Sequence, residues 1–406
     1  MNLFAFSFST IYNIVNSSRI KKLKERSMEQ EVVSTTNKNI DSAVSELCRK
    51  LKRDLSSYQA VIFMAAIDYD FHELSQKIKE KFPASEVIGT STAGEFTAQG
   101  FTEGSIVLTT MYDSGTKVKG VLVDSGSKYP LVYKSDIEAA LRFCGIGIGD
   151  PSSHRNAFAL EFTNAVFNAE ESILSTFYSI IKNDKFPLAG ATAGYTGSEA
   201  KSFVSYNGKV TQDGATMLFV KTRCPFDIRQ EDIFNITGKH VFVTKSETMK
   251  REIHSFNGRP AATVYAEQLG VSESEAAKMT FENPFGRYIN GSIHIVALAS
   301  LTPSKTITTF ARVTPNTSLE MMHIGDAEQK ADQTCKGILE KIPRPKFTLL
   351  MTCITRTLYF DRTGLKSKII GKYKSAFPTF CGMSCYGEQI GRAHCNQTLV
   401  SLVIGE

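Results

Sequence analysis

One short motif recurs three times in this chain, each time after a Phe-Pro pair. In every copy an apolar segment runs into a loop of glycines and small hydroxyl residues, at residues 87–96, 188–194 and 380–388. Glycine tolerates positive φ and lets the backbone approach a bound group, so such loops offer N–H donors and hydroxyls to a ligand. A tight turn that binds nothing is the alternative. The recurrence favours a shared pocket. Its candidate ligand-binding residues are Gly89, Thr90, Ser91, Gly94, Glu95, Gly190, Thr192, Gly194, Gly382, Ser384, Gly387 and Glu388.

The segments around each motif predict one order of elements: strand, helix, strand, loop and further strands. The first strands are predicted by unbroken apolar runs at residues 60–67, 156–162 and 347–354. The helices are predicted at residues 71–81, 170–182 and 365–374. The later strands are short and joined by turns such as Asn207-Gly208, which favours antiparallel neighbours. We therefore predict an α/β fold of mixed sheets with flanking helices, in which three units form a pseudo-repeat and the glycine loops line one crevice.

The pattern changes after Cys224, which places a domain boundary near residues 221–238. We expect an N-terminal tail with a leading helix at 1–56, a first domain at 57–221 and a second at 222–406. The apolar run at 3–15 precedes its basic residues, the reverse of a secretory signal, and it is too short to span a bilayer. Residues 1–27 are expected to be an over-long start or a loosely attached tail.

Composition indicates a soluble globular protein and argues against nucleic-acid binding. The chain has 406 residues, 42% of them hydrophobic, and its net charge of +6 is dispersed without an aromatic-interleaved basic motif. Eight cysteines in a chain of this length do not suggest a disulfide framework. They indicate a reducing, cytoplasmic setting.

No catalytic constellation stands out, so we expect a protein that is not an enzyme. Ser91 does not lie in a GxSxG nucleophile elbow, and a binding or turn role is favoured over a hydrolytic or acyl-transfer role. Glu95 and Glu388 either accept hydrogen bonds from a ligand or have a structural role, in which they cap their loops or pair with an arginine. Arg356 either clamps a ligand carboxylate or forms a structural salt bridge. The spacing of Cys381, Cys385, His394 and Cys395 matches no recognised zinc motif, so no metal is predicted.

Several short motifs together resemble the FIST sensory domain family, with its N-terminal and C-terminal halves. They occur in the family's order over about residues 57–404 and read STAGE at 91–95, DGA at 213–215, NGRPA at 257–261 and NQTLV at 396–400. The chain departs from the family pattern at Cys381 and Cys385, and Cys395 separates His394 from Asn396.

The resemblance implies a cytoplasmic sensory module that binds a small polar metabolite such as an amino acid. It also implies a separate signalling partner, such as a histidine kinase or a cyclic-dinucleotide enzyme. No cofactor is predicted from the residues, but some stand-alone members are haem-containing nitric oxide sensors. Haem is therefore the alternative, with His394 or His294 as the axial ligand.

Overall fold

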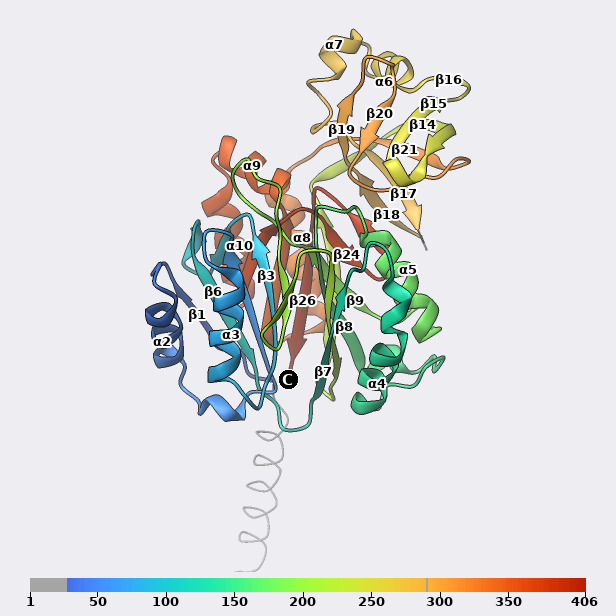
Figure 1. Ribbon diagram of the computed structural model, residues 1–406. Coiled ribbons are helices and arrows are strands. Elements are labelled where there is room, and N and C mark those ends of the chain that lie inside the picture. The colour runs from blue at the N-terminus through green and yellow to red at the C-terminus, as the bar shows by residue number, and fades with distance from the viewer. Residues whose placement is uncertain (1–27, 290) are drawn as a thin grey trace, which may run out of the picture.

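Three six-stranded sheets surround one shared core, and a fourth, eight-stranded sheet stands apart at one end (Figure 1). The computed structural model describes residues 28–289 and 291–406. The predicted α/β class with mixed sheets and three repeated units is confirmed. Within those residues no helix has the length and apolar character needed to cross a membrane. The predictions for residues 1–27 lie outside the described residues.

The three six-stranded sheets have the following strands, in spatial order from one edge to the other. The first sheet contains β1 (Val32–Thr35), β6 (Ile106–Met111), β2 (Ala60–Ala66), β3 (Glu86–Thr92), β10 (Val204–Tyr206) and β11 (Lys209–Thr211). The second contains β25 (Ala393–Cys395), β24 (Glu388–Ile390), β9 (Leu188–Thr192), β8 (Ala157–Thr163), β12 (Gly214–Lys221) and β7 (Lys117–Asp124). The third contains β13 (Phe226–Asp232), β26 (Thr398–Gly405), β22 (Pro345–Cys353), β23 (Cys381–Cys385), β4 (Glu95–Thr97) and β5 (Gly100–Thr102).

The three sheets share one topology and exchange hairpins in a ring. Each has a parallel central pair, β2–β3, β8–β9 or β22–β23. The first strand of each pair also has an antiparallel neighbour, which is β6, β12 or β26. The hairpin after each glycine loop then joins a different sheet. Hairpin β4–β5 pairs with β23, β10–β11 pairs with β3, and β24–β25 pairs with β9. Each six-stranded sheet is therefore built from two units of the repeat.

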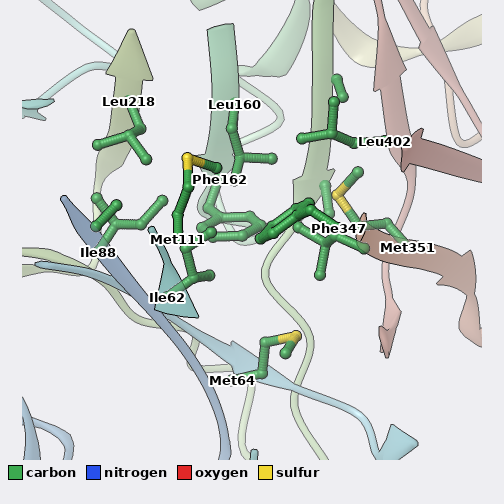
Figure 2. Packing of buried hydrophobic residues seen from close by; sticks show 14 of the residues in the cluster. Ile62, Met64, Ile88, Met111, Leu160, Phe162, Leu218, Phe347, Met351 and Leu402 are labelled. Carbon is green, nitrogen blue, oxygen red and sulfur yellow. The ribbon is translucent and has the colours of Figure 1, made fainter. Parts of the chain in front are cut away.

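Period-two alternation places one face of every sheet in the shared core. Ile62 and Met64 of β2 point into that core, whereas Val61 and Phe63 point toward the helices. Figure 2 shows side chains from all three sheets meeting in this cluster. Burying a side chain such as Phe162 contributes about 1.5–3 kcal/mol.

Helices cover the outer face of each sheet with their apolar sides. They are α2 (Ile40–Lys50) and α3 (Phe71–Lys81) on the first sheet, α4 (Lys134–Cys144) and α5 (Glu170–Ile181) on the second, and α8 (Ala327–Lys341), α9 (Ile354–Arg362) and α10 (Lys366–Ala376) on the third. Side-chain oxygens of Asn39, Asp70 and Asp326 cap the N-termini of α2, α3 and α8. Short 3₁₀ turns occur at Leu55–Ser57, Pro130–Tyr133, Ser153–Arg155 and Thr248–Lys250.

Residues 234–289 and 291–324 form the fourth sheet and its helices, which we call the inserted domain. Its elements are β14 (Phe234–Glu247), β15 (Glu252–Phe256), β16 (Arg259–Pro260), α6 (Ala261–Leu269), α7 (Glu273–Ala276), β17 (Phe285–Ile289), β18 (Ser292–Val296), β19 (Leu298–Leu301), β20 (Ile307–Thr309) and β21 (Ser318–Ile324). It lies in the chain between β13 and α8, both of which belong to the third sheet and its helix layer. It has an apolar core of its own around Phe256, Tyr265 and Phe285.

One helix of the third unit was not predicted. The strand expected at 347–354 ends at Cys353, and a helix that was not predicted, α9, begins at Ile354. Arg356, Thr357 and Phe360 of this helix are buried on one face, at helical spacing. Cys353 stands at the N-cap and makes no side-chain capping hydrogen bond, so the usual sequence signal of a helix start is absent at this boundary.

Candidate functional site

The three glycine loops converge, as their pseudo-symmetry predicted, and they hydrogen bond to one another. The N–H of Gly194 donates to the Ser91 carbonyl (2.9 Å), and the N–H of Ser384 donates to the Gly94 carbonyl (2.7 Å). The N–H of Thr192 donates to the Gly387 carbonyl (2.8 Å). These donors are therefore already used by neighbouring loops, and all of these residues are buried.

The loop hydroxyls are held by the chain in the same way. The Oγ of Ser91 donates to the Gly194 carbonyl (2.8 Å) and accepts from the N–H of Phe203 (3.0 Å). The Oγ1 of Thr90 donates to the carbonyl of Ser91 (3.1 Å). The Oγ of Ser384 lies 2.9 Å from the Oγ1 of Thr357. Ser91 thus has a structural role at the junction of two loops.

Glu95 and Glu388 occupy equivalent positions and close their loops. Glu95 accepts from the hydroxyl of Thr92 and from the N–H and hydroxyl of Ser105. Glu388 accepts from the thiol of Cys385 (3.1 Å) and from the N–H of Thr398 (3.2 Å) and its hydroxyl. Burial raises the pKa of Glu95 to about 7 and that of Glu388 to about 8. All four carboxyl oxygens therefore have partners within the chain.

Arg356 lies on α9, in the helix layer of the third sheet. It is fully buried, pairs with Glu231 and donates to the hydroxyl of Tyr373 (3.3 Å). This geometry is that of a structural ion pair, the second of the two roles expected for Arg356.

A second set of contacts distinguishes the three sheets from one another. The first glycine of each loop, Gly89, Gly190 or Gly382, lies within a strand and leaves room for a larger side chain on the neighbouring strand. A Cβ added to Gly89 would stand 2.1 Å from the ring of Phe63, and one added to Gly382 would stand 2.2 Å from the ring of Phe96. In the first and third sheets the glycine therefore accommodates an aromatic ring.

In the second sheet the same row of cross-strand neighbours is polar. Glu161, Gly190, Gln389 and His394 face one another in turn across β8, β9, β24 and β25. The third sheet has Leu350, Gly382, Phe96 and Phe101 in these places. We call the four residues of the second sheet the polar row.

The polar row is buried and keeps unused hydrogen-bonding capacity. Gln389 donates to Thr192 (2.8 Å), and its Nε2 lies 3.2 Å from Nδ1 of His394. Among the described residues, both oxygens of Glu161, the Oε1 of Gln389 and the Nε2 of His394 have no hydrogen-bond partner. Burial, with the nearby charge of Glu170, raises the pKa of Glu161 to about 8. Burial also lowers the pKa of His394, so at neutral pH both groups are uncharged.

Charged residues of α5 and the inserted domain border the polar row. The Nη2 of Arg251 donates to Glu170 and to Glu171 (2.7 Å each), and Glu170 also accepts from Thr192 (3.4 Å). The N–H of Arg312 donates to Glu171 (2.7 Å). Although burial opposes it, the pKa of Glu171 is lowered, by His394 when that ring is protonated and at neutral pH by Arg251 and the N–H of Arg312. The polar row and these ion pairs together form the candidate site.

The geometry around the two candidate haem ligands does not fit a porphyrin. His394 is 1% exposed, and its Cε1 lies 2.5 Å from where a Cβ on Gly387 would stand. His294 contacts the Sγ of Cys395 (3.2 Å) and borders a cavity of ≈270 Å³, below the range of about 300–1,000 Å³ usual for ligand pockets. Within the described residues, no three His, Cys, Asp or Glu side chains are grouped to hold a metal ion.

Two larger hollows, of ≈840 and ≈740 Å³, lie elsewhere on the molecule. The first lies between β7, α4 and the β10–β11 hairpin, and the second between the β4–β5 hairpin and α10. None of the residues predicted from the sequence to bind a ligand lines either hollow.

Of the predicted residues, the site brings together Gly190, Thr192, Gly387 and His394. Gln389, Glu170, Glu171, Arg251 and Arg312 were missed, and so was Glu161. A local signal existed for Glu161, because a charged residue interrupts the otherwise apolar strand β8. Arg251 gives no such signal, because its partners are 80 and 81 residues away in the chain.

Comparison with known proteins gives the class. The FIST N domain model matches residues 59–259 and the FIST C domain model matches residues 261–391. The chain belongs to the FIST family, whose domains are sensory domains of signalling proteins. An uncharacterized protein of Methanocaldococcus jannaschii, MJ1623, is 25% identical over 231 residues, which cover 55% of this chain and 43% of that protein. The chain thus matches less than half the length of this relative.

Similarity to solved structures is remote. A cyanuric acid hydrolase from A. caulinodans has 7% identity and a TM-score of 0.26, over 48% of this chain and 71% of that one. A second cyanuric acid hydrolase structure has 7% identity and a TM-score of 0.29, over 74% and 100%. PurLQS from Thermotoga maritima has 9% identity and a TM-score of 0.22, over 94% and 73%. At these TM-scores the similarity carries no information about activity.

Proposed function

We propose that this protein is a non-catalytic, cytoplasmic sensor that binds a small polar metabolite at the polar row of the second sheet and signals by contact to a separate protein. The observation that supports this most strongly is the contrast between the sheets. Where the third sheet packs Leu350 against Phe96, the second sheet has Glu161 and Gln389 with unused polar atoms.

Unused polar capacity is costly inside a protein. Each buried donor or acceptor without a partner costs about 1–3 kcal/mol. The equivalent row of the third sheet shows that the same topology accepts apolar packing at this point. A polar row therefore weakens the fold unless water or a ligand completes its hydrogen bonds.

The neighbouring charges suggest the chemistry of the metabolite. Glu170 and Glu171 can accept from an ammonium group, and Arg251 and Arg312 can donate to a carboxylate. An amino acid carries both groups. The signalling partner, such as a histidine kinase or a cyclic-dinucleotide enzyme, is inferred from the family.

The test is ligand binding by the purified full chain. Thermal-shift screening against amino acids and related metabolites would be followed by calorimetry of each hit. We expect Gln389→Leu to weaken binding about ten-fold or more, because it removes the amide between Thr192 and His394. Ser205→Ala is the matched control, since Ser205 faces Gly89 in the first sheet as Gln389 faces Gly190 in the second.

Three results would overturn this proposal. Equal binding by wild type and Gln389→Leu would place the site elsewhere. Turnover of the ligand that is lost in Ser91→Ala would establish an enzyme instead. A Soret band in the haem-loaded protein that is lost in His394→Ala or His294→Ala would establish the haem alternative.

A further inference from the structure

The backbone of Arg251 is fixed by contacts within the inserted domain, and its side chain extends from there to α5. It lies between β14 and β15 with φ of +54°, and its carbonyl accepts from the N–H (2.8 Å) and the hydroxyl (3.1 Å) of Thr309. Its Nη1 donates to Asn168 (2.8 Å). The guanidinium is therefore pre-positioned, and 6% of the residue is exposed.

The arginines at this interface outnumber the carboxylates that face them. Arg251 and Arg312 of the inserted domain contact Glu170 and Glu171 of α5, and Arg287 lies beside them, since its Nη1 donates to the carbonyl of Arg312. In each of the three arginines the Nε has no hydrogen-bond partner among the described residues. Arginine has five N–H donors and is always charged, so the interface has both an excess positive charge and unused donors.

The two glutamates are held differently. Glu170 is 2% exposed and also contacts Thr192 of the second glycine loop. The side chain of Glu171 is 15% exposed and lies at the margin, between Nη2 of Arg251 (2.7 Å), the N–H of Arg312 (2.7 Å) and Nε of Arg312 (3.7 Å). Its carboxylate is surrounded by N–H donors as a bound carboxylate would be, and part of its side chain is exposed to solvent.

We infer that Arg251 and Arg312 form a carboxylate-binding clamp, that Glu171 occupies this clamp in the present conformation, and that a small organic carboxylate replaces it on binding. The inference rests on the proposed function and deepens it. The remaining polar groups of the ligand lie toward Gln389 and His394, whose free Oε1 and Nε2 complete the site. Replacing Glu171 removes one tie between α5 and the inserted domain, so binding changes the contact between these two parts of the molecule.

The test removes the internal occupant. In Glu171→Gln the side chain keeps its shape but loses its charge, so a ligand carboxylate no longer competes with it. We expect at least one of acetate, glycine, glutamate and succinate to bind about ten-fold or more tightly to this variant than to wild type. Acetamide, glycinamide and succinamide lack the carboxylate and are expected to gain nothing. Glu73→Gln, which changes an exposed acidic residue in the first turn of α3, is the matched control.

A second variant tests the cation. Arg251→Met is expected to abolish binding of the same carboxylates, whereas Arg259→Met, which removes an exposed arginine of the same domain, leaves it unchanged. If Arg251→Met does not fold, the comparison of carboxylate affinity between Glu171→Gln and wild type still tests the clamp.

Several outcomes would overturn the clamp. The first is that Glu171→Gln and wild type bind carboxylates with equal affinity, and the second is that the amides gain as much affinity as the acids in Glu171→Gln. The third is that inorganic phosphate binds more tightly than the carboxylates. The fourth is that Glu171→Gln binds none of these compounds, which would mean that the site is filled by water only. A neutral metabolite that binds wild type and depends on Gln389 would overturn the clamp alone and leave the proposed function standing.

Discussion

The second and third sheets have the same strand order, the same parallel central pair and a glycine at the same point, yet they use that glycine differently. In the third sheet the ring of Phe96 lies over Gly382, and Leu350 is the neighbour of Gly382 on the other side. In the second sheet the amide of Gln389 lies over Gly190, and Glu161 is the neighbour of Gly190 on the other side. The topology therefore does not determine whether this glycine accommodates an apolar or a polar side chain. Three side chains, Glu161, Gln389 and His394 in place of Leu350, Phe96 and Phe101, distinguish the row with unused polar atoms from the apolar one.

The largest effect is expected at the buried ion pair of the third sheet. Arg356→Met leaves Glu231 buried without its cation, which should lower the free energy of unfolding by about 3–5 kcal/mol in urea titrations. Ligand binding at the second sheet should be unchanged in folded protein. A loss below about 1 kcal/mol would mean that the pair does not stabilise the third sheet as its burial indicates.

The glycine substitutions compare the two rows directly. In Gly382→Ala the new Cβ meets the carbonyl of Leu350 at 2.3 Å as well as the ring of Phe96, and a loss of about 3 kcal/mol is expected. In Gly190→Ala it meets Oε1 of Gln389 at 2.8 Å and the carbonyl of Glu161 at 2.9 Å. A loss of about 1–2 kcal/mol is expected there. The reverse order in chemical denaturation would show that the second row is the more tightly packed.

Glu161→Leu, which introduces the residue type of the third row, should change the pH dependence of stability. The pKa of Glu161 is raised from 4.5 to about 8, so between these values the folded protein keeps a proton that the unfolded chain releases. The contribution of this group to the free energy of unfolding is therefore present in full below pH 4.5. It is lost as the pH rises toward 8.

Between pH 5.5 and 8 the wild type should lose about 3 kcal/mol more than Glu161→Leu. Thermal and urea unfolding of both proteins at several pH values measures the difference. Parallel curves would contradict it. Glu95 and Glu388 also have raised pKa values but are common to both proteins, so they cancel in the comparison.

The smallest effect is expected at the first glycine loop. Ser91→Ala removes the hydroxyl that donates to the Gly194 carbonyl and leaves the N–H of Phe203 without that acceptor. A loss of about 1 kcal/mol in urea titrations is expected, with ligand binding retained. Loss of binding without loss of stability would move the site from the second sheet to this loop.

Local sequence patterns predicted the strands, helices and turns of each repeated unit, but they did not predict which strands of different units pair. The apolar run of β2, the helix α3 and the turn at Asn207-Gly208 follow from short-range rules, and all three are present. The pairing of the β10–β11 hairpin with β3 joins Ser205 to Gly89, more than a hundred residues apart, and no local pattern specifies it. The loops therefore could be found from the sequence, whereas their partners could not.

The candidate site shows the same limit. Thr192 and His394 stood in recognisable motifs, but their role depends on Gln389, which reaches them only because β24 pairs with β9. Arg251 arrives from another sheet altogether. Contacts of this kind are set by packing, which a single sequence does not display.

The ring of exchanged hairpins also has a consequence for synthesis of the protein. The β4–β5 hairpin leaves the ribosome early, yet its partner β23 begins at Cys381, and β13 pairs with β26 (Thr398–Gly405). The nascent chain must therefore carry unpaired strand edges for most of its translation, and folding must wait for contacts of very high sequence separation. Slow folding, with strand edges exposed during elongation, is expected from the same exchange that ties the finished molecule together.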